Sequence, residues 1–257
     1  MTDAPKIPIK NEPHKINIPI HIFNWGPCIV RFKISNQFQE ALLKEAYKAR
    51  AAKRDYRKKL AGHIKEEYAM DLKEFNPYFK QVFNLYHGAW KNFTGDTGKE
   101  KVEYVMKTLW VNFQKQNEYN PLHDHSEALT FVIYLKIPQE IKTENEAYVG
   151  TSRGPGSIMF VYGEGGRQFV TYQSHLPEDR DIFVFPAAVK HMVAPFRSDC
   201  ERISVSGNVS SHIPIAEMPP HIKYEVVDMD DPKAANLDPN KNVANSGNKT
   251  VEADKKP

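Results

Sequence analysis

Three histidines stand out as residues that could act together in chemistry. His123 and His125 are separated by one residue at the end of a polar turn, and His191 follows an apolar, strand-like segment far downstream. Alternate residues of a strand point to the same side, so His123 and His125 can share a face. Two close imidazoles and a distant third can occupy one face of a metal ion and leave other positions open. The spacing therefore predicts a metal site of the catalytic kind.

The acidic residues near the histidine pair leave the set of ligands open. The commoner iron site combines two histidines and a carboxylate, with the spacing His-x-Asp and a distant histidine. Residue 125 is a histidine here, so strand alternation favours a site made of His123, His125 and His191. Asp124 would supply a carboxylate if the turn broke the alternation. Glu127 would do so if the His-x-acid pair began at His125.

An arginine follows the third histidine after eleven residues and opens the last predicted strand. Arg202 and Ser204 occupy alternate positions, so they share one face of that strand. A guanidinium can bind a carboxylate through two parallel hydrogen bonds, and a serine hydroxyl can add another. Ile203 and Val205 form the opposite face, and the pattern is compatible with either face pointing inward.

The strands that would position these residues fill the second half of the sequence. Short runs rich in β-branched and aromatic residues alternate with turn signals, and no helix is expected between them. This pattern predicts a mainly β domain, either an antiparallel sandwich or a jelly roll. The predicted strands are 102–114, 129–137, 157–162, 169–173, 181–185 and 202–209.

A hairpin and a first helix are predicted at the start of the chain. Residues 16–35 are rich in β-branched and aromatic types and are interrupted by the turn signal at 24–27. Asn36 is a plausible helix cap, and the helical spacing of apolar residues continues from there through a basic run at 50–59 toward Gly62. The basic run is interpreted as a solvated helix face rather than as a polyanion site.

A second helix is predicted with Asn76 as its cap and Pro77 in its first position, and Gly95 and Gly98 are expected to end it. Its apolar stripe is expected to pack on an outer face of the β domain. The segment 60–72 between the two helices contains His63, Glu66 and Glu67. It is interpreted as an ordinary exposed loop, with a lid over the site as the alternative.

The composition excludes several classes of protein. The chain has 257 residues, 40% of them hydrophobic, a formal net charge of +3 and only two cysteines. It therefore has enough apolar residues for one large domain, no disulfide framework and no strong charge for binding nucleic acid or lipid. Without an apolar leader or membrane span, a soluble, cytoplasmic protein is expected. We expect a single domain over 1–227, with its helical part at 36–95, and a disordered polar tail over 228–257.

The motifs HDH, FPAAVKH and RIS, in this order, resemble the Fe(II)/2-oxoglutarate dioxygenases. The likeness covers roughly 101–208 and is strongest to an uncharacterised, prolyl-hydroxylase-like group of these oxygenases found in marine bacteria and phages. The matching residues are Trp110, Asn112, Asn120, His123, His125 and the pair Tyr134-Leu135. The resemblance implies the double-stranded β-helix, a cupin-like jelly roll.

The resemblance also implies an activity and its cofactors. Fe(II) would bind His123, His125 and His191, and the cosubstrate 2-oxoglutarate would bind Arg202. Ser204, Tyr134 and Asn112 would assist in holding the cosubstrate. The implied reaction hydroxylates a peptide or protein side chain and releases succinate and CO2, while the basic run at 50–59 leaves room for a nucleotide substrate. The histidine at position 125 departs from the family's usual acid.

Two alternatives follow from that departure. One is a non-catalytic jelly-roll module that binds a metal or another ligand. The other is a three-histidine dioxygenase of the cupin type that does not use 2-oxoglutarate, in which Arg202 would bind the carboxylate of the substrate itself.

Overall fold

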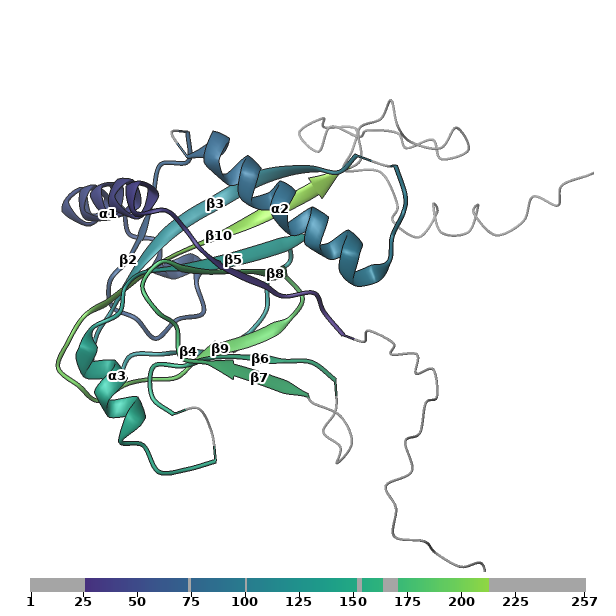
Figure 1. Cartoon of the computed structure of the whole chain (residues 1–257). Helices are drawn as coiled ribbons and strands as arrows, with labels where there is room; N and C mark the ends of the chain where they lie inside the picture. The colour runs from purple at the N-terminus through teal and green to yellow at the C-terminus, as the bar shows by residue number, and fades with distance from the viewer. Residues whose placement is uncertain (1–25, 74, 100, 152–153, 164–170, 213–257) are drawn as a thin grey trace, which may run out of the picture. The chain divides into compact units, whose positions relative to one another are not determined.

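A computed structural model describes residues 26–73, 75–99, 101–151, 154–163 and 171–212. It contains two β-sheets, three α-helices and one short 3-10 helix (Figure 1). The helices are α1 Asn36–Ala51, α2 Asn76–Thr94, α3 Gln139–Glu146 and the 3-10 turn Arg57–Lys59. The strands are β1 Val30–Lys33, β2 Glu67–Ala69, β3 Glu103–Gln114, β4 Asn120–His123, β5 Leu129–Lys136, β6 Ile158–Val161, β7 Tyr172–His175, β8 Asp181–Pro186, β9 Lys190–Val193 and β10 Arg202–His212.

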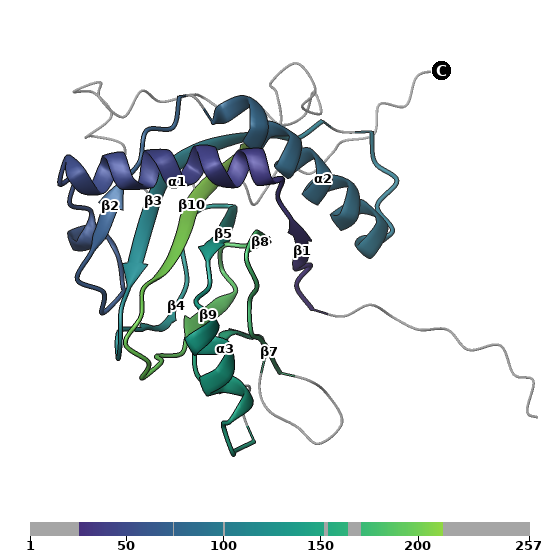
Figure 2. The same ribbon diagram turned by 60° about the vertical axis from the view of Figure 1, so that its left-hand side comes forward.

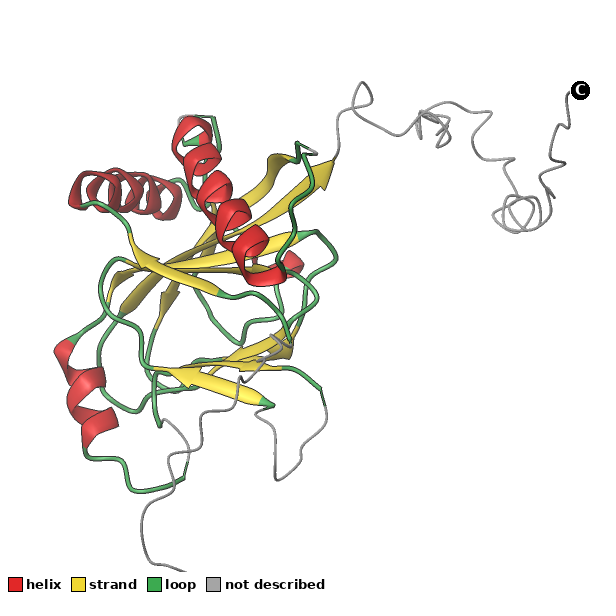
Figure 3. Ribbon diagram, turned by 45° about the vertical axis from the view of Figure 1, so that its right-hand side comes forward, coloured by secondary structure: helices red, strands yellow, loops and turns green. Residues whose placement is uncertain are grey.

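The order of the strands defines the fold. The larger sheet has the order β1-β8-β5-β10-β3-β2 and the smaller sheet the order β4-β9-β6-β7, with every pair antiparallel. From β3 to β10 the chain passes repeatedly between the two sheets, which lie face to face (Figure 3). This interleaved arrangement is the double-stranded β-helix, and the predicted fold class is confirmed.

The large sheet is covered on both faces, which explains its long apolar strands. Helices α1 and α2 lie across its outer face (Figure 2), and the inner face looks toward the small sheet. Ile203 and Val205 belong to the outer core beneath the helices, so Arg202 and Ser204 point inward. The period of two in β10 thus separates packing residues from cavity residues.

Helix α1 differs from the prediction at both ends. Its N-cap is Ser35, whose side chain accepts a hydrogen bond from the backbone N–H of Phe38, and not Asn36. The helix ends at Ala51 and does not continue through the basic run. Lys53 has a φ angle of 50°, and the backbone N–H of Tyr56 donates to the carbonyl of Glu67. After this turn the chain leads to β2 at the edge of the large sheet.

Helix α2 agrees with the sequence pattern. Phe75 takes the N-cap position that was predicted for Asn76, and Pro77 lies in the first turn. The helix ends before Gly95, whose φ angle of 71° is in the left-handed region that favours glycine. Its apolar stripe packs on the large sheet, with the buried side chains of Phe79, Val82, Phe83 and Tyr86.

The segment 60–72 is not the exposed loop that we expected. Residues Glu67–Ala69 form β2, which pairs with Asn112, Val111 and Trp110 of β3 at the edge of the large sheet. The strand is too short to be recognised from its residue pattern, because the backbone partners that define it come from elsewhere in the chain. Helix α3 and strands β4 and β9 were also not predicted.

Several predictions fall wholly or partly outside the described residues. Of the hairpin expected over 16–35, only β1 lies in the described part, and of the strand expected over 169–173 only its last residues do, within β7. The limits 1–227 of the domain and the disordered tail 228–257 stay predictions. No helix in the described part of the chain is long and apolar enough to cross a membrane.

Candidate active site

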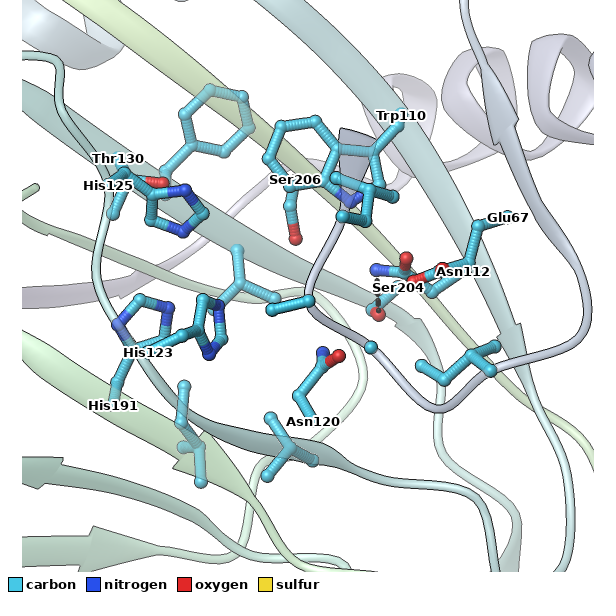
Figure 4. Close-up of a pocket in the computed structure, with 18 of the residues that line it drawn as sticks. Glu67, Trp110, Asn112, Asn120, His123, His125, Thr130, His191, Ser204 and Ser206 are labelled. Carbon is cyan, nitrogen blue, oxygen red and sulfur yellow. Dashed lines mark hydrogen bonds between the residues drawn. The ribbon is translucent and has the colours of Figure 1, made fainter. Parts of the chain in front are cut away.

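A cavity of about 200 Å³ lies between the inner face of the large sheet and the small sheet. Strands β3, β5 and β10 line one side with polar side chains at alternate positions, and β4, the turn after it and β9 contribute the histidines (Figure 4). The segment 60–64 and strand β2 also line it. The cavity therefore collects residues from distant parts of the chain.

The three predicted histidines meet in this cavity. His123 at the end of β4 pairs in register with His191 of β9, and His125 follows two residues later. The backbone N–H of His125 donates to the carbonyl of Ala187, which fixes the turn. One ring nitrogen of each histidine lies within 4.8 Å of the corresponding nitrogens of the other two. This separation suits three ligands around a single metal ion.

Hydrogen bonds orient two of the rings for coordination. The Nδ1 atom of His123 lies 2.8 Å from the carbonyl oxygen of Pro121, and the Nδ1 atom of His191 lies 2.9 Å from that of Val189. A carbonyl oxygen can only accept, so Nδ1 carries the proton and donates it in both rings. The Nε2 lone pairs are then free to bind a metal.

Burial keeps the imidazoles of His125 and His191 uncharged. Together with the neighbouring His123 ring, it lowers the pKa of His125 to about 4 and that of His191 to about 3. Neutral imidazole is the form that coordinates metals. The site is therefore prepared for a cation near neutral pH.

The acidic alternatives are less well placed as ligands. Asp124 lines the cavity but does not belong to the group of converging ligand atoms found among the described residues. Glu127 accepts a hydrogen bond of 2.6 Å from the hydroxyl of Ser210 instead. The geometry thus favours the three-histidine assignment.

Arg202 is a buried cation without an acidic partner. Its exposed fraction is 1%, and burial lowers its pKa. The guanidinium donates to the carbonyl of Gly156 at 2.5 Å and to the side-chain oxygen of Gln114, while its Nε atom has no partner. No carboxylate of the described residues forms an ion pair with it. A buried, unpaired charge is costly, so the cavity is suited to an anionic ligand.

The three residues predicted to assist Arg202 lie in one row across the sheet. Tyr134 of β5 and Asn112 of β3 both pair in register with Ser204 of β10. The Asn112 amide donates to the Ser204 hydroxyl at 3.3 Å. The hydroxyl of Tyr134 has no partner, and burial raises the pKa of Tyr134 to about 12. These groups supply further donors around the arginine.

Sequence reasoning assigned no role in the site to several residues that line the cavity. On the inner face of the large sheet these are Gln114, Ser206, Asn208, Glu67 of the edge strand β2, and Trp110, which entered only as a residue matching the family. Polar residues at every second position of otherwise apolar strands were a usable signal for Gln114, Ser206 and Asn208. Glu67 carried no such signal because its strand was not recognised.

Residues 108–208 match the family described as "Putative 2OG-Fe(II) oxygenase". This segment is similar to the 2OG-Fe(II) oxygenases. The match covers less than half of the 257 residues, but it contains the three histidines, Arg202 and the strands β4 to β9 that connect them. The predicted resemblance is therefore confirmed, and with it the enzyme class of this oxygenase segment.

Several solved structures are similar to this chain. A Pseudomonas putida prolyl-4-hydroxylase is 14% identical, with 71% of this chain and 91% of that chain covered and a TM-score of 0.47. A Trichoplax adhaerens prolyl hydroxylase in complex with a peptide is 11% identical, with 72% and 83% covered and a TM-score of 0.48.

HygX from Streptomyces hygroscopicus with nickel and 2-oxoglutarate bound is 11% identical, with 73% and 83% covered and a TM-score of 0.43. Sequence identities and TM-scores this low do not assign a substrate to this chain. A search of curated proteins found no match.

Proposed function

We propose that the protein is an Fe(II)- and 2-oxoglutarate-dependent oxygenase that hydroxylates a primary substrate. One observation carries the proposal. A buried guanidinium without an acidic partner shares one cavity with three converging imidazoles, two of which are held neutral by burial. Such a cavity offers a place for a metal ion and a place for an anionic cosubstrate.

His123, His125 and His191 would hold the iron. Their nitrogens converge, and the Nδ1 hydrogen bonds of His123 and His191 leave Nε2 free, so these residues fit a divalent ion. Three ligands on one face leave coordination positions open, as a catalytic metal requires. When bound, iron and 2-oxoglutarate supply an oxidation in which O2 is consumed, 2-oxoglutarate becomes succinate and CO2, and a substrate C–H bond becomes C–OH.

Arg202 would bind the carboxylate of 2-oxoglutarate that is remote from the metal. Its Nε–H has no partner in the described part of the chain, and the hydroxyls of Ser204 and Tyr134 lie in the neighbouring row of the sheet. A planar guanidinium pairs better with a carboxylate than the compact ammonium group of a lysine does. The protein thus orients the cosubstrate and excludes water from it.

The direct test is the conversion of 2-oxoglutarate into succinate by purified, Fe(II)-loaded protein. We expect succinate formation that requires Fe(II) and is lost in H191A, together with calorimetric binding of 2-oxoglutarate. Oxygen uptake with no 2-oxoglutarate requirement would contradict the proposal and favour the three-histidine dioxygenase. Tight metal binding without either activity or 2-oxoglutarate binding would favour the non-catalytic module.

A further inference from the structure

One corner of the cavity, beside β2, presents side-chain oxygens that lack donors. Glu67 is 1% exposed, and its buried Oε2 atom has no hydrogen-bond partner among the residues that the structure describes. Asn112 pairs in register with Glu67 and uses its amide nitrogen for Ser204, so its buried Oδ1 atom also lacks a partner. Buried acceptors without donors cost free energy, which the donors of a ligand would recover.

Asn120 and Gly62 complete this corner, which we call the acceptor corner. A methyl group at position 62 would lie 2.7 Å from Oε1 of Glu67 and would also collide with Oδ1 of Asn120. Both oxygens therefore approach the same point, and glycine leaves space for them. Figure 4 shows the carboxyl of Glu67 beside the amide of Asn112, with the three histidines elsewhere around the cavity.

The electrostatics of the acceptor corner favour a cation. Glu67 forms no ion pair within the described part of the chain, and burial, reinforced by the charge of Glu118, raises its pKa to about 7. Asp55 adds to this rise, and Arg57 opposes it weakly. Glu118 itself is occupied by the backbone N–H groups of Lys65 and Lys115. A cationic ligand would replace the missing counter-charge of Glu67.

An aromatic ring adds to this preference. Trp110 lines the cavity on the same face of β3 as Asn112, two residues away, and its ring lies 6.1 Å from that of Tyr56. The face of a tryptophan ring attracts ammonium and guanidinium groups. The corner thus combines a carboxyl, two amide oxygens and an aromatic wall.

We propose that Glu67, Asn112 and Asn120 recognise a cationic nitrogen group, an ammonium or a guanidinium, on the primary substrate. This inference rests on the proposed function, because it names the substrate class of the same cavity. Arg202 holds the anionic cosubstrate and Glu67 holds the cationic substrate, so the two ligands are sorted by charge. A side chain of the lysine or arginine type has the required chemistry.

The test compares two small probes that differ in the cationic group. Nα-acetyl-lysine methylamide carries an ammonium, and Nα-acetylnorleucine methylamide does not. Each is titrated calorimetrically into the full chain without added metal or 2-oxoglutarate, so that the result does not depend on the cosubstrate site. We expect the lysine probe to bind at least about tenfold more tightly than the norleucine probe, as for a charge-assisted hydrogen bond.

Two variants make the test specific. E67Q should lose the preference for the lysine probe, whereas E103Q should keep it, because Glu103 at the start of β3 does not line the cavity and pairs with His212. At pH 7, the lysine probe should also release about half a proton from wild type and none from E67Q, as measured in buffers of different ionisation enthalpy. This proton release is a readout that a merely structural role of Glu67 would not give.

The outcomes separate the inference from the proposed function. Equal binding of the two probes by wild type, or a lysine preference that survives in E67Q, would overturn the inference. A lysine preference that depends on Glu67 supports it, even in a protein that fails to bind 2-oxoglutarate. That failure would contradict the proposed function alone.

Discussion

At the scale of single residues, the cavity places its ionisable groups in unusual states. Arg202 is buried without a carboxylate, two histidines are kept neutral, and Glu67 is buried without a cation. The buried charge of Arg202 and the buried carboxyl of Glu67 each cost stability, and a ligand of opposite charge would relieve each cost, whereas the neutral histidines can bind a metal cation. Ionisable groups with shifted pKa values that gather in one cavity are typical of functional sites.

Replacement of Arg202 tests the cosubstrate site. R202M removes the buried guanidinium that would neutralise the cosubstrate carboxylate, so we expect 2-oxoglutarate to bind about 100-fold or more weakly, which corresponds to about 3 kcal/mol. R202K keeps the charge but loses the planar fork, and it should bind with intermediate affinity. Calorimetric titration of the three proteins measures this, and unchanged affinity in R202M would exclude Arg202 as the cosubstrate ligand.

Replacement of Glu67 tests its protonation state through the free energy of unfolding. The pKa of Glu67 is about 7 in the folded protein and 4.5 in an unperturbed chain, so the folded state binds more protons between these values. Stability is then lost as the pH rises from 4.5 through 7. E67Q should equal wild type near pH 4.5 and exceed it near pH 8 by on the order of 3 kcal/mol.

Urea unfolding of both proteins across this pH range measures the difference. E66Q is the matched control, because Arg50 and Lys115 hold the pKa of Glu66 at about 2 against the opposing effect of burial. This variant should lose stability at neutral pH and gain none at pH 8. A constant difference between E67Q and wild type at all pH values would show that Glu67 does not titrate as described.

At the scale of elements, strand β2 is held over the cavity by an ionic network. Arg50 of α1 donates to both Glu66 and Glu201, and Lys115 pairs with Glu66 at 2.7 Å. The Arg50 guanidinium also lies 4.3 Å from the centre of the Phe113 ring. The network connects α1 with Glu66, the residue before β2, and with Glu201, the residue before β10. It therefore positions Glu67 indirectly.

Removal of the centre of this network should loosen β2. We expect R50M to lower the free energy of unfolding by about 1 kcal/mol, since the pairs are partly buried and share one cation. Amide hydrogen exchange at Glu67 and Ala69 should accelerate more than exchange in β5. R57M removes an exposed pair with Asp55 and serves as a control without a measurable effect. Equal exchange rates at β2 in R50M and wild type would contradict the role of the network.

The elements also show what the sequence can and cannot reveal. Period-two alternation correctly placed Arg202 with Ser204, because one face of β10 is buried. His123 and His125 also converge as predicted, although β4 ends at His123 and His125 lies in the turn that follows. Apolar stripes located most of α1 and α2, although the N-cap of each helix lies one residue before the predicted one. Strand β2 was missed because three residues gain their structure only by pairing with β3, and the polar helix α3 buries only Ile141. The acceptor corner depends on β2 and was missed with it.

At the scale of the whole molecule, the double-stranded β-helix explains how residues 123 and 191 meet. β4 and β9 are neighbours in the small sheet although β5 to β8 separate them in the chain, so the metal site closes a long loop. A metal that binds the folded state alone therefore stabilises the connection between distant strands. Metal binding and folding should be coupled.

The melting temperature measures this coupling. At a free metal concentration of 100 times Kd, a divalent ion should add about 2.7 kcal/mol, or roughly 5–10 °C for a domain of this size. H191A should lose the shift. H87A should retain it, because His87 contacts Tyr104 outside the cavity. An equal shift in H191A and wild type would show that the metal binds elsewhere.

The most direct measurement of the central claim is Fe(II)-dependent succinate formation from 2-oxoglutarate by wild type, H191A and R202M in parallel. The three-histidine and arginine arrangement predicts turnover in wild type only, with metal content lost in H191A and retained in R202M. Turnover that persists in both variants, or a metal-loaded wild type that neither binds nor consumes 2-oxoglutarate, would contradict it.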